Sequence, residues 1–285
     1  MQYKTIGILY ICTGQYRRLW KQFYESFECH FLHETKKHYF VFTDAPSEYI
    51  LEGCDSDRVS VISINNLPWP LITLLRFRFF LSIQDELSEY DYLMFSNANL
   101  ACNVDILEKE FLPNTGEGKR LAFVQHPGYW QCPYYKAPFE RDNRSLAFVP
   151  YSYNIPYVIG ALFCGESSAF LEMSTVLNGR IESDLKNNVI ARWHDESHLN
   201  RYLINRDDIA VLSPSYCYPA YIDIDAEKKI YSVDKAKIID IKAVKGDVCR
   251  AQPNSFFYRI RKWFMLNHPI KGLFDVIFHF RVEKL

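Results

Sequence analysis

The alternation of short apolar runs with helical segments over the first 125 residues constrains the fold of this chain more than any other feature. Four runs are rich in β-branched and aromatic residues and predict buried strands: 5–12, 38–43, 58–64 and 91–96. Apolar residues recur at helical spacing over 19–27, and we expect a helix from Pro70 to about Leu87. This order predicts an α/β fold with a mostly parallel sheet and helices on both faces.

Polar residues follow several of the predicted strands at their carboxyl ends. Thr13 and Gly14 follow the first strand, Asp44 follows the second, and residues 97–99 follow the fourth. In an open α/β sheet, ligands bind beyond these ends of the strands. We therefore expect the binding site at this edge of the sheet.

The 285 residues contain no repeat and no clear linker before about residue 251, so we expect one domain over 1–250 and a tail over 251–285. Residues 126–160 are rich in Pro, Tyr and Gly and indicate an ordered loop with short strands, whereas 161–206 return to apolar and helical patterns. The net charge of −1 argues against a nucleic-acid binder, because phosphate neutralisation needs an excess of basic residues.

The cysteines and the N-terminus bear on the compartment. The eight cysteines form no CxxC pair, so their spacing indicates neither a zinc site nor a disulfide framework. The apolar N-terminal run is too short to cross a bilayer, and Thr13, Gly14 and a charged stretch follow it. We expect reduced thiols, a first strand in place of a membrane anchor, and a cytoplasmic protein.

A dense polar cluster, WHDESHLN at 193–200, is the main candidate for chemistry. It places Trp193 beside the adjacent carboxylates Asp195 and Glu196. Helix capping by Asp195 or Ser197 is the alternative interpretation. The face of a tryptophan stacks on sugar rings, and carboxylates bind hydroxyls and stabilise oxocarbenium-like charge. The cluster therefore indicates a carbohydrate site.

Asn97 and Asn99 stand at a strand end where an acidic Asp-x-Asp pair would hold a divalent cation against a diphosphate. Hard cations prefer anionic oxygen ligands, and two neutral amides supply none. The pair therefore predicts direct contact with ribose or phosphate and no metal site. Turn asparagines that close a strand are the alternative.

Two sets of basic residues are candidates for binding anions. Arg76 lies in the apolar segment LITLLRFRFF, so its guanidinium either extends to the surface or points into a site to meet phosphate or carboxylate. Lys242, Lys245 and Arg250 form a small basic group after a predicted strand. They are either a solvated face or a clamp for a diphosphate leaving group, which a site without metal would need.

Together these strings resemble glycosyltransferase family 6, which includes the blood-group A and B transferases and alpha-1,3-galactosyltransferase. The resemblance covers residues 5 to about 220 in the right order. The matching strings are IGILYICTGQY (6–16), HYFVFTD (38–44), WP-x-x-TLLRF (69–77), NAN (97–99), HPG (126–128), FER (139–141), WHDESHLN-x-Y (193–202) and LSPSYC (212–217).

The resemblance implies a GT-A fold, in which a Rossmann-like UDP-sugar-binding part, here about 1–125, merges with an acceptor-binding part, here about 126–250. It implies a retaining transfer from a UDP-sugar to the 3-hydroxyl of a β-galactoside. The Asn-x-Asn string is similar to the bacterial branch of the family, which works without metal. We accordingly expect no cofactor, with the UDP-sugar as donor substrate.

By match of motif, the resemblance also assigns roles to single residues. Glu196 would be the catalytic residue, facing the anomeric carbon and also contacting the acceptor. The other assignments are donor-sugar contacts by Asp195, Arg76, Ile159 and Ala161, nucleotide contacts by Ile11, Thr13, Tyr16, Asn97, Asn99, Lys242, Lys245 and Arg250, and acceptor contacts by His126 and Trp193.

The size of one side chain bears on the choice of donor sugar. The selectivity segment of the family aligns with Ile159-Gly160-Ala161, and a third-position glycine leaves room for an N-acetyl group, whereas a methyl group favours galactose. Ala161 thus favours UDP-galactose and a blood-group-B-like product, with UDP-N-acetylgalactosamine as the alternative. A change of this size discriminates by about 10–200-fold. A fucosylated, lipopolysaccharide-type acceptor is expected from the resemblance, although SYCYP (215–219) departs from the acceptor-contacting segment of the animal members.

The last 30 residues carry a different signal. Apolar residues recur at helical spacing over 256–264 and again over 270–278, and six basic residues stand against two acidic ones. Aromatic, basic amphipathic helices suit the surface of an anionic membrane, so we expect peripheral contact with the inner face of the cytoplasmic membrane. Packing on the core or on a second subunit is the alternative, and the oligomeric state stays open.

Two other classes of protein are alternatives to a hexosyltransferase. A sugar-binding module without catalysis would not need the complete set His194-Asp195-Glu196. A dinucleotide oxidoreductase is disfavoured because no GxGxxG follows the first strand.

Overall fold

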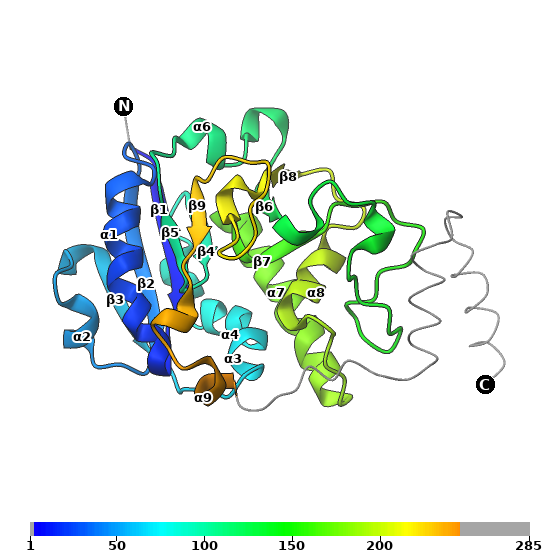
Figure 1. Ribbon diagram of the computed structural model, residues 1–285, viewed down its shortest axis with the longest axis horizontal. Coiled ribbons are helices and arrows are strands. Elements are labelled where there is room, and N and C mark those ends of the chain that lie inside the picture. The colour runs from blue at the N-terminus through cyan, green and yellow to red at the C-terminus, as the bar shows by residue number, and fades with distance from the viewer. Residues whose placement is uncertain (1–2, 246–285) are drawn as a thin grey trace.

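The computed structural model describes residues 3–245, which form a mixed α/β fold around a central sheet (Figure 1). The strands are β1 (Thr5–Ile11), β2 (Lys36–Thr43), β3 (Val59–Ser63), β4 (Tyr92–Ser96), β5 (Leu100–Cys102), β6 (Leu121–Gln125), β7 (Val158–Glu166), β8 (Ile209–Leu212) and β9 (Ile230–Ser232). The α-helices are α1 (Trp20–His30), α2 (Ser47–Leu51), α3 (Leu71–Leu74), α4 (Arg76–Leu81), α5 (Gln84–Leu87), α6 (Glu108–Phe111), α7 (Ser167–Lys186), α8 (His194–Tyr202) and α9 (Ile241–Lys245). The 3-10 helices are η1 (Gly14–Leu19), η2 (Ser56–Arg58), η3 (Thr115–Glu117), η4 (Pro127–Tyr129), η5 (Tyr134–Lys136), η6 (Pro214–Cys217) and η7 (Lys235–Lys237).

The central sheet has seven strands in the order β3-β2-β1-β4-β7-β6-β8. The first four of these are parallel, β7 is antiparallel to both β4 and β6, and β8 is parallel to β6. A separate antiparallel pair joins β5 to β9. The predicted α/β class with a mostly parallel sheet is confirmed, and the arrangement agrees with a GT-A-type fold. The strand order reverses between β1 and β4, where sheets of this kind bind ligands.

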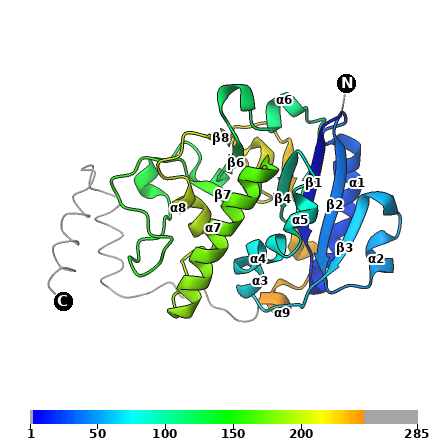
Figure 2. The same ribbon diagram turned by 180° about the vertical axis from the view of Figure 1, so that it is seen from behind.

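Two hydrophobic clusters cover the two faces of the sheet. Figures 1 and 2 show the helices on these faces from opposite sides, with α1 on one face and α4 and α7 on the other. Ile6, Ile8 and Tyr10 of β1 face the cluster that holds α1, whereas Leu9 faces the cluster that holds α4 and α7. This alternation follows from the two-residue period of a strand. Many of the aromatic residues serve this packing, for example Phe23, whose ring centroid lies 4.1 Å from that of Phe27.

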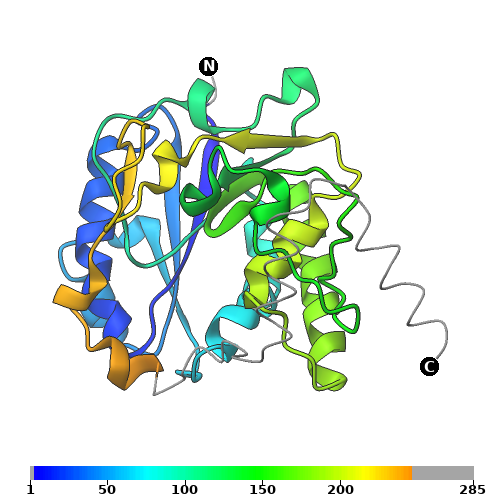
Figure 3. The same ribbon diagram turned by 45° about the vertical axis from the view of Figure 1, so that its right-hand side comes forward.

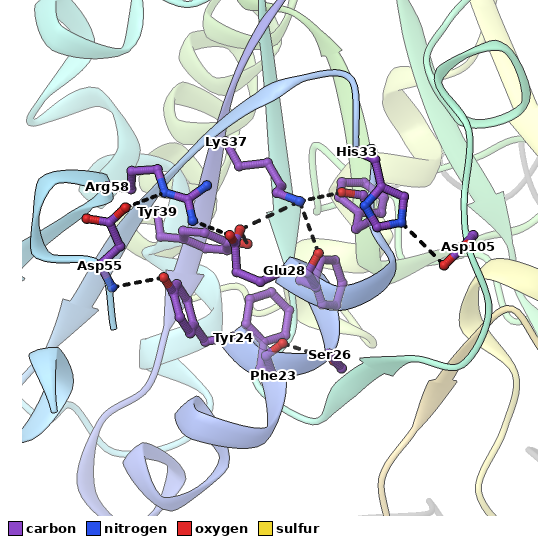
Figure 4. Close-up of polar contacts among 12 residues, drawn as sticks. Phe23, Tyr24, Ser26, Glu28, His33, Lys37, Tyr39, Asp55, Arg58 and Asp105 are labelled. Atoms are coloured by element: carbon purple, nitrogen blue, oxygen red, sulfur yellow. Dashed lines mark hydrogen bonds and ion pairs between the residues drawn. The ribbon is translucent and has the colours of Figure 1, made fainter. Parts of the chain in front are cut away.

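A charged cluster around the buried Lys37 links the end of α1 to β2 (Figure 4). Lys37 donates hydrogen bonds from Nζ to the carbonyl oxygens of Phe27, at 3.2 Å, and Phe31, at 2.6 Å. Its Nζ also lies 3.6 Å from Glu28, which accepts a hydrogen bond from Tyr39 and pairs with Arg58. A cation at the carboxyl end of a helix satisfies carbonyl groups that the helix leaves unpaired.

Three predicted elements differ from the structure. The helix expected over 70–87 is divided into α3, α4 and α5, since Leu75 and Ile83 leave the helical region. Residues 126–160 contain η4 and η5, and only their last residues enter a strand, β7. Residues 161–166, predicted within an apolar and helical stretch, belong to β7. This strand is buried on both faces, so its sequence lacks the alternation that separates strand from helix.

Two sequence predictions concern membranes. In residues 3–245, none of the helices has the length and apolar character that crossing a membrane requires. The predicted amphipathic helices and membrane contact of the tail, 256–285, lie outside the described residues, and both stay predictions.

Gly165 offers a test of the β6–β7 packing. A Cβ atom at this position would lie 2.8 Å from the carbonyl oxygen of Arg120 and 2.4 Å from Cδ2 of Leu121. We expect Gly165→Ala to lower the free energy of unfolding by about 1–3 kcal/mol, measured by urea denaturation, because the backbone of Arg120 cannot move aside cheaply. The control is Gly179→Ala in α7, where a Cβ would meet no atom within 4 Å. This change should instead stabilise by about 0.5–1 kcal/mol, and equal effects of the two changes would contradict the prediction.

Candidate active site

The site forms where the first turn of α8 meets the start of β7, on the side of the molecule that Figure 3 brings forward. The side chain of Asn200 joins these two elements. Its Oδ1 accepts a hydrogen bond from the N–H of Val158 at 2.9 Å, and its Nδ2 donates to the carbonyl oxygens of Val158 and Glu196, both at 2.9 Å. A Cβ added at Gly160 would lie 3.2 Å from Oδ2 of Asp195. The missing side chain at Gly160 therefore lets the two acidic residues approach the strand.

Both carboxylate oxygens of Glu196 accept hydrogen bonds. The hydroxyl of Tyr157 donates to Oε1 at 2.8 Å, and the backbone N–H of Gly160 donates to Oε2 at 2.8 Å. The Glu196 side chain is only partly buried, in contrast to the buried Asp195. The carboxylate is therefore held in one orientation, although the residue as a whole is not fully buried.

Asp195 pairs with Arg76 in the interior. Asp195 and Arg76 are 5% and 4% exposed as residues, and Nη1 of Arg76 lies 3.1 Å from Oδ2 of Asp195. The same Nη1 donates to the carbonyl oxygen of Gly160 at 2.7 Å, and the guanidinium lies 4.2 Å from the ring centroid of Phe95. Of the two alternatives for Arg76, the structure therefore selects the inward one, in which it meets a carboxylate.

Burial raises the pKa values of both acids toward neutral pH. It raises the pKa of Asp195 to about 6, against the opposing effects of Arg76 and of the Thr73 hydroxyl. Burial also raises the pKa of Glu196 to about 7, although the Gly160 N–H and the Tyr157 hydroxyl favour the ionised form. Such shifts are common among catalytic acids and nucleophiles.

The other residues of the WHDESHLN string separate in space. Trp193 precedes α8 and is 36% exposed. Its backbone N–H donates a hydrogen bond to Oγ of Ser197 at 3.0 Å. His194 adopts a φ of +53° and lies with its ring centroid 4.7 Å from that of Trp69. His198 is buried 3.5 Å from Asp184, where burial lowers its pKa to about 4. His198 thus belongs to the core and not to the site.

His126, a predicted acceptor contact, adjoins Tyr157. Its Nδ1 accepts a hydrogen bond from the N–H of Gly128 at 3.0 Å, and its ring centroid lies 5.7 Å from that of Tyr157. Burial lowers the pKa of His126 to about 4, so the imidazole is neutral at pH 7. The structure thus brings His126 and Glu196 to opposite ends of the same tyrosine.

The two asparagines lie between β4, β7 and the segment after β9. The N–H of Asn97 donates to the carbonyl oxygen of Ala161 at 2.8 Å. The carbonyl oxygen of Asn99 accepts a hydrogen bond from the N–H of Val233 at 2.7 Å. The Asn-x-Asn string is therefore adjacent to the predicted selectivity segment, in which Ile159 is partly exposed and Ala161 is 7% exposed.

The predicted nucleotide contacts at the end of β1 adjoin the C-terminal part of the described chain. Ile11 ends β1, and Thr13 precedes η1, which contains Tyr16. Nζ of Lys235 lies 5.7 Å from the ring centroid of Tyr16, and the N–H of Asp240 donates to Oε1 of Gln15 at 3.0 Å. The helix that follows, α9, contains Lys242 and Lys245. Their side chains, and the whole of Arg250, lie outside the described part of the chain.

Sequence reasoning missed three residues that build the site. Asn200 lies in the WHDESHLN string and Glu140 in the FER string, but the sequence assigned neither of them a role. Tyr157 precedes an apolar run, and no other sequence pattern marks it as functional. Oε1 of Glu140 accepts hydrogen bonds from the N–H groups of Arg141, at 2.7 Å, and Asp142, at 2.8 Å. Its Oε2 accepts a hydrogen bond from the backbone N–H of Arg192. This bond links the FER segment (139–141) to the chain just before α8.

Within residues 3–245, no group of three or more His, Cys, Asp or Glu side chains is placed to hold a metal ion. At the strand end itself stand Asn97 and Asn99, whose amides suit a hard cation poorly. Metal independence stays a prediction.

The sequence model described as glycosyltransferase family 6 matches residues 1–242. The O-antigen biosynthesis glycosyltransferase WbnI of Escherichia coli is 35% identical over 233 residues, which are 82% of this chain and 96% of that protein. The globoside alpha-1,3-N-acetylgalactosaminyltransferase 1 of Gallus gallus is 29% identical over 220 residues, 75% of this chain and 62% of the relative. The histo-blood group ABO system transferase 2 of Rattus norvegicus is 28% identical over 218 residues, 75% of this chain and 63% of the relative. The chain thus spans nearly the whole bacterial relative and less than two thirds of these two animal relatives.

The raised pKa of Glu196 predicts a pH-dependent effect on stability. Its folded-state pKa of about 7 lies above the ordinary 4.5, so the folded chain holds the proton longer and loses stability as pH rises between these values. Glutamine cannot ionise, so we expect Glu196→Gln to gain stability relative to the parent, on the order of 3 kcal/mol, between pH 4.5 and 7.5.

Urea denaturation at several pH values measures this difference, and any constant cost of the substitution cancels. Glu117→Gln, at an exposed position in η3, is the control and should show no such trend. A stability difference for Glu196→Gln that is independent of pH would refute the prediction.

Proposed function

Since this chain belongs to glycosyltransferase family 6 and is a hexosyltransferase, we propose that it moves galactose from UDP-galactose to the 3-hydroxyl of a fucosylated β-galactoside. In the proposed reaction the configuration at the anomeric carbon is retained, and no metal takes part. The observation that supports this most is the set Arg76, Asp195 and Glu196 held against the start of β7. It joins one buried, ion-paired carboxylate to one that neutral donors hold in a fixed orientation.

The two carboxylates take different roles in the proposed reaction. Asp195, held by Arg76, binds hydroxyls of the donor sugar, while Glu196 faces the anomeric carbon. The bond between that carbon and the UDP oxygen breaks, and its electron pair leaves with the diphosphate. Glu196 then stabilises the oxocarbenium-like carbon, or bonds to it covalently in an intermediate whose C–O bond to Glu196 breaks when the acceptor attacks. The acceptor 3-hydroxyl bonds to the anomeric carbon, and its proton passes to the diphosphate oxygen of the departing UDP.

The nucleotide occupies the edge at the carboxyl ends of β1 and β4. In the proposal, Ile11, Thr13 and Tyr16 line the base, and Asn97 and Asn99 contact ribose or diphosphate through their amides. Charge that develops on the leaving diphosphate is taken up by the basic group Lys242, Lys245 and Arg250 in place of a metal. Preorganised positive charge of this kind stabilises a transition state strongly.

The acceptor lies on the side of His126 and Trp193. The partly exposed Trp193 offers an indole face for a galactose ring, and the neutral His126 offers a hydrogen bond. The name of the Escherichia coli relative refers to O-antigen biosynthesis, which supports a lipopolysaccharide-type acceptor for this chain. Such an acceptor also supports action at the inner face of the cytoplasmic membrane, with contact through residues 256–285.

One assay tests the reaction, the donor and the metal together. We expect the full-length protein to transfer galactose from UDP-galactose to 2′-fucosyllactose in preference to lactose, and equally well with and without EDTA. Preference for UDP-N-acetylgalactosamine by about tenfold or more would assign the alternative donor. Loss of activity in EDTA that Mn²⁺ restores would refute metal independence, and the absence of any UDP release with acceptor would favour a non-catalytic sugar-binding module.

Glu196→Gln tests the catalytic assignment. We expect the transfer rate to fall by at least about a hundredfold, because glutamine cannot supply the negative charge that stabilises the anomeric carbon. The affinity for UDP, measured by calorimetry, should change less than about twofold, since UDP does not reach the carboxylate. An unchanged rate would exclude Glu196 from the reaction.

A further inference from the structure

We propose that Tyr157 is the positioning residue for Glu196, holding one carboxylate oxygen so that the side chain stays ionised and correctly oriented toward the reacting carbon. This inference rests on the catalytic role proposed for Glu196. Tyr157 itself is not expected to contact either sugar. It acts through its hydroxyl, which donates to Oε1 of Glu196 at 2.8 Å.

The hydrogen bond from the Tyr157 hydroxyl complements the one that the backbone of Gly160 donates to Glu196. Oε2 of Glu196 is held by the N–H of Gly160, also at 2.8 Å, and a single hydrogen bond would leave the carboxylate free to rotate about it. The Tyr157 hydroxyl holds the second oxygen and so fixes the plane of the group. An ionised carboxylate can accept hydrogen bonds at about four lone-pair sites, two on each oxygen. Each oxygen of Glu196 therefore keeps capacity for a further interaction.

Tyr157 is itself rigid enough for this role. It is 3% exposed and lies in a small cluster with Phe139, whose ring centroid is 5.0 Å away, and Tyr129, at 5.4 Å. Its carbonyl oxygen accepts a hydrogen bond from the N–H of His126 at 2.8 Å. Burial raises the pKa of the Tyr157 hydroxyl well above 10, so the group stays a donor.

Charged and titratable groups face this pair from several elements. Asp195 neighbours Glu196 on α8, Arg76 reaches it from α4, and the Cys217 thiol of η6 lies within its electrostatic influence. Tyr129 of η4 and Arg192, just before α8, act on Tyr157. Burial raises the pKa of Glu196, and two hydrogen-bond donors, the Tyr157 hydroxyl and the Gly160 N–H, lower it. Removal of the hydroxyl therefore leaves less to oppose protonation.

The test is Tyr157→Phe, which keeps the ring and removes only the hydroxyl. A hydrogen bond to a charged group is strong enough that its loss should move the acid limb of the kcat–pH profile upward by about one to two pH units. We expect kcat at pH 7 to fall about tenfold and to recover in part at higher pH, while KM for the donor changes less than about twofold. In a Glu196→Gln background the same change should have little further effect on the residual rate.

Tyr202→Phe is the matched control. This tyrosine lies on α8 and is 5% exposed, and its hydroxyl accepts a hydrogen bond from Nη1 of Arg206 at 2.7 Å, away from Glu196. Its loss should leave the acid limb in place. An acid limb that does not move in Tyr157→Phe, or that moves equally in Tyr202→Phe, would overturn the proposal, because a purely structural tyrosine lowers stability without shifting the titration.

A second measurement keeps this outcome separate from the proposed function. The Glu196 carboxyl is titrated by NMR in protein carrying ¹³C-labelled glutamate, with Glu196→Gln used to assign the signal. A higher pKa in Tyr157→Phe than in the parent supports the positioning role even where no sugar transfer is detected. An unchanged pKa refutes that role while leaving Glu196 as the proposed catalytic group.

Discussion

The close approach of α8 to the start of β7 is the contact on which the candidate active site depends. Gly160 has no side chain, so Asp195 and Glu196 reach the strand backbone, and Asn200 completes the contact by pairing with both backbone groups of Val158. A larger residue at position 160 would separate the carboxylates from their partners. Arg76, Tyr157 and the Gly160 N–H all act at this point, because the approach places them within hydrogen-bond distance.

Burial and pairing divide two adjacent acids into unlike groups. Asp195 lies inside with Arg76 as its counterion, and breaking such a pair leaves an uncompensated charge in the interior. Glu196 is held by neutral donors and remains partly exposed. Different environments for neighbouring carboxylates are how enzymes give each a separate role. The pair therefore suits a site in which one acid binds and the other reacts.

Segments far apart in the sequence meet around this contact. The loop over 126–160 is tied to the start of α8 through Glu140 and contributes His126 and Tyr157. On the other side, the segment after β9 packs against Asn99 and η1, which brings 233–240 to the predicted nucleotide edge. The loop before β7 thus borders one side of the site, and the segment after β9, which follows the separate β5–β9 pair, borders the other.

The sequence alone determined the α/β class and the family, because strand-helix alternation and the WHDESHLN string are local in the chain. It predicted the edge of the sheet at which the candidate site lies. It also singled out Asp195 and Glu196. Only the tertiary structure decided that Arg76 turns inward, that His198 belongs to the core, and that Tyr157 holds Glu196. These outcomes depend on which groups share a buried space, and burial and hydrogen-bond partners arise from contacts between distant segments, which no local pattern records.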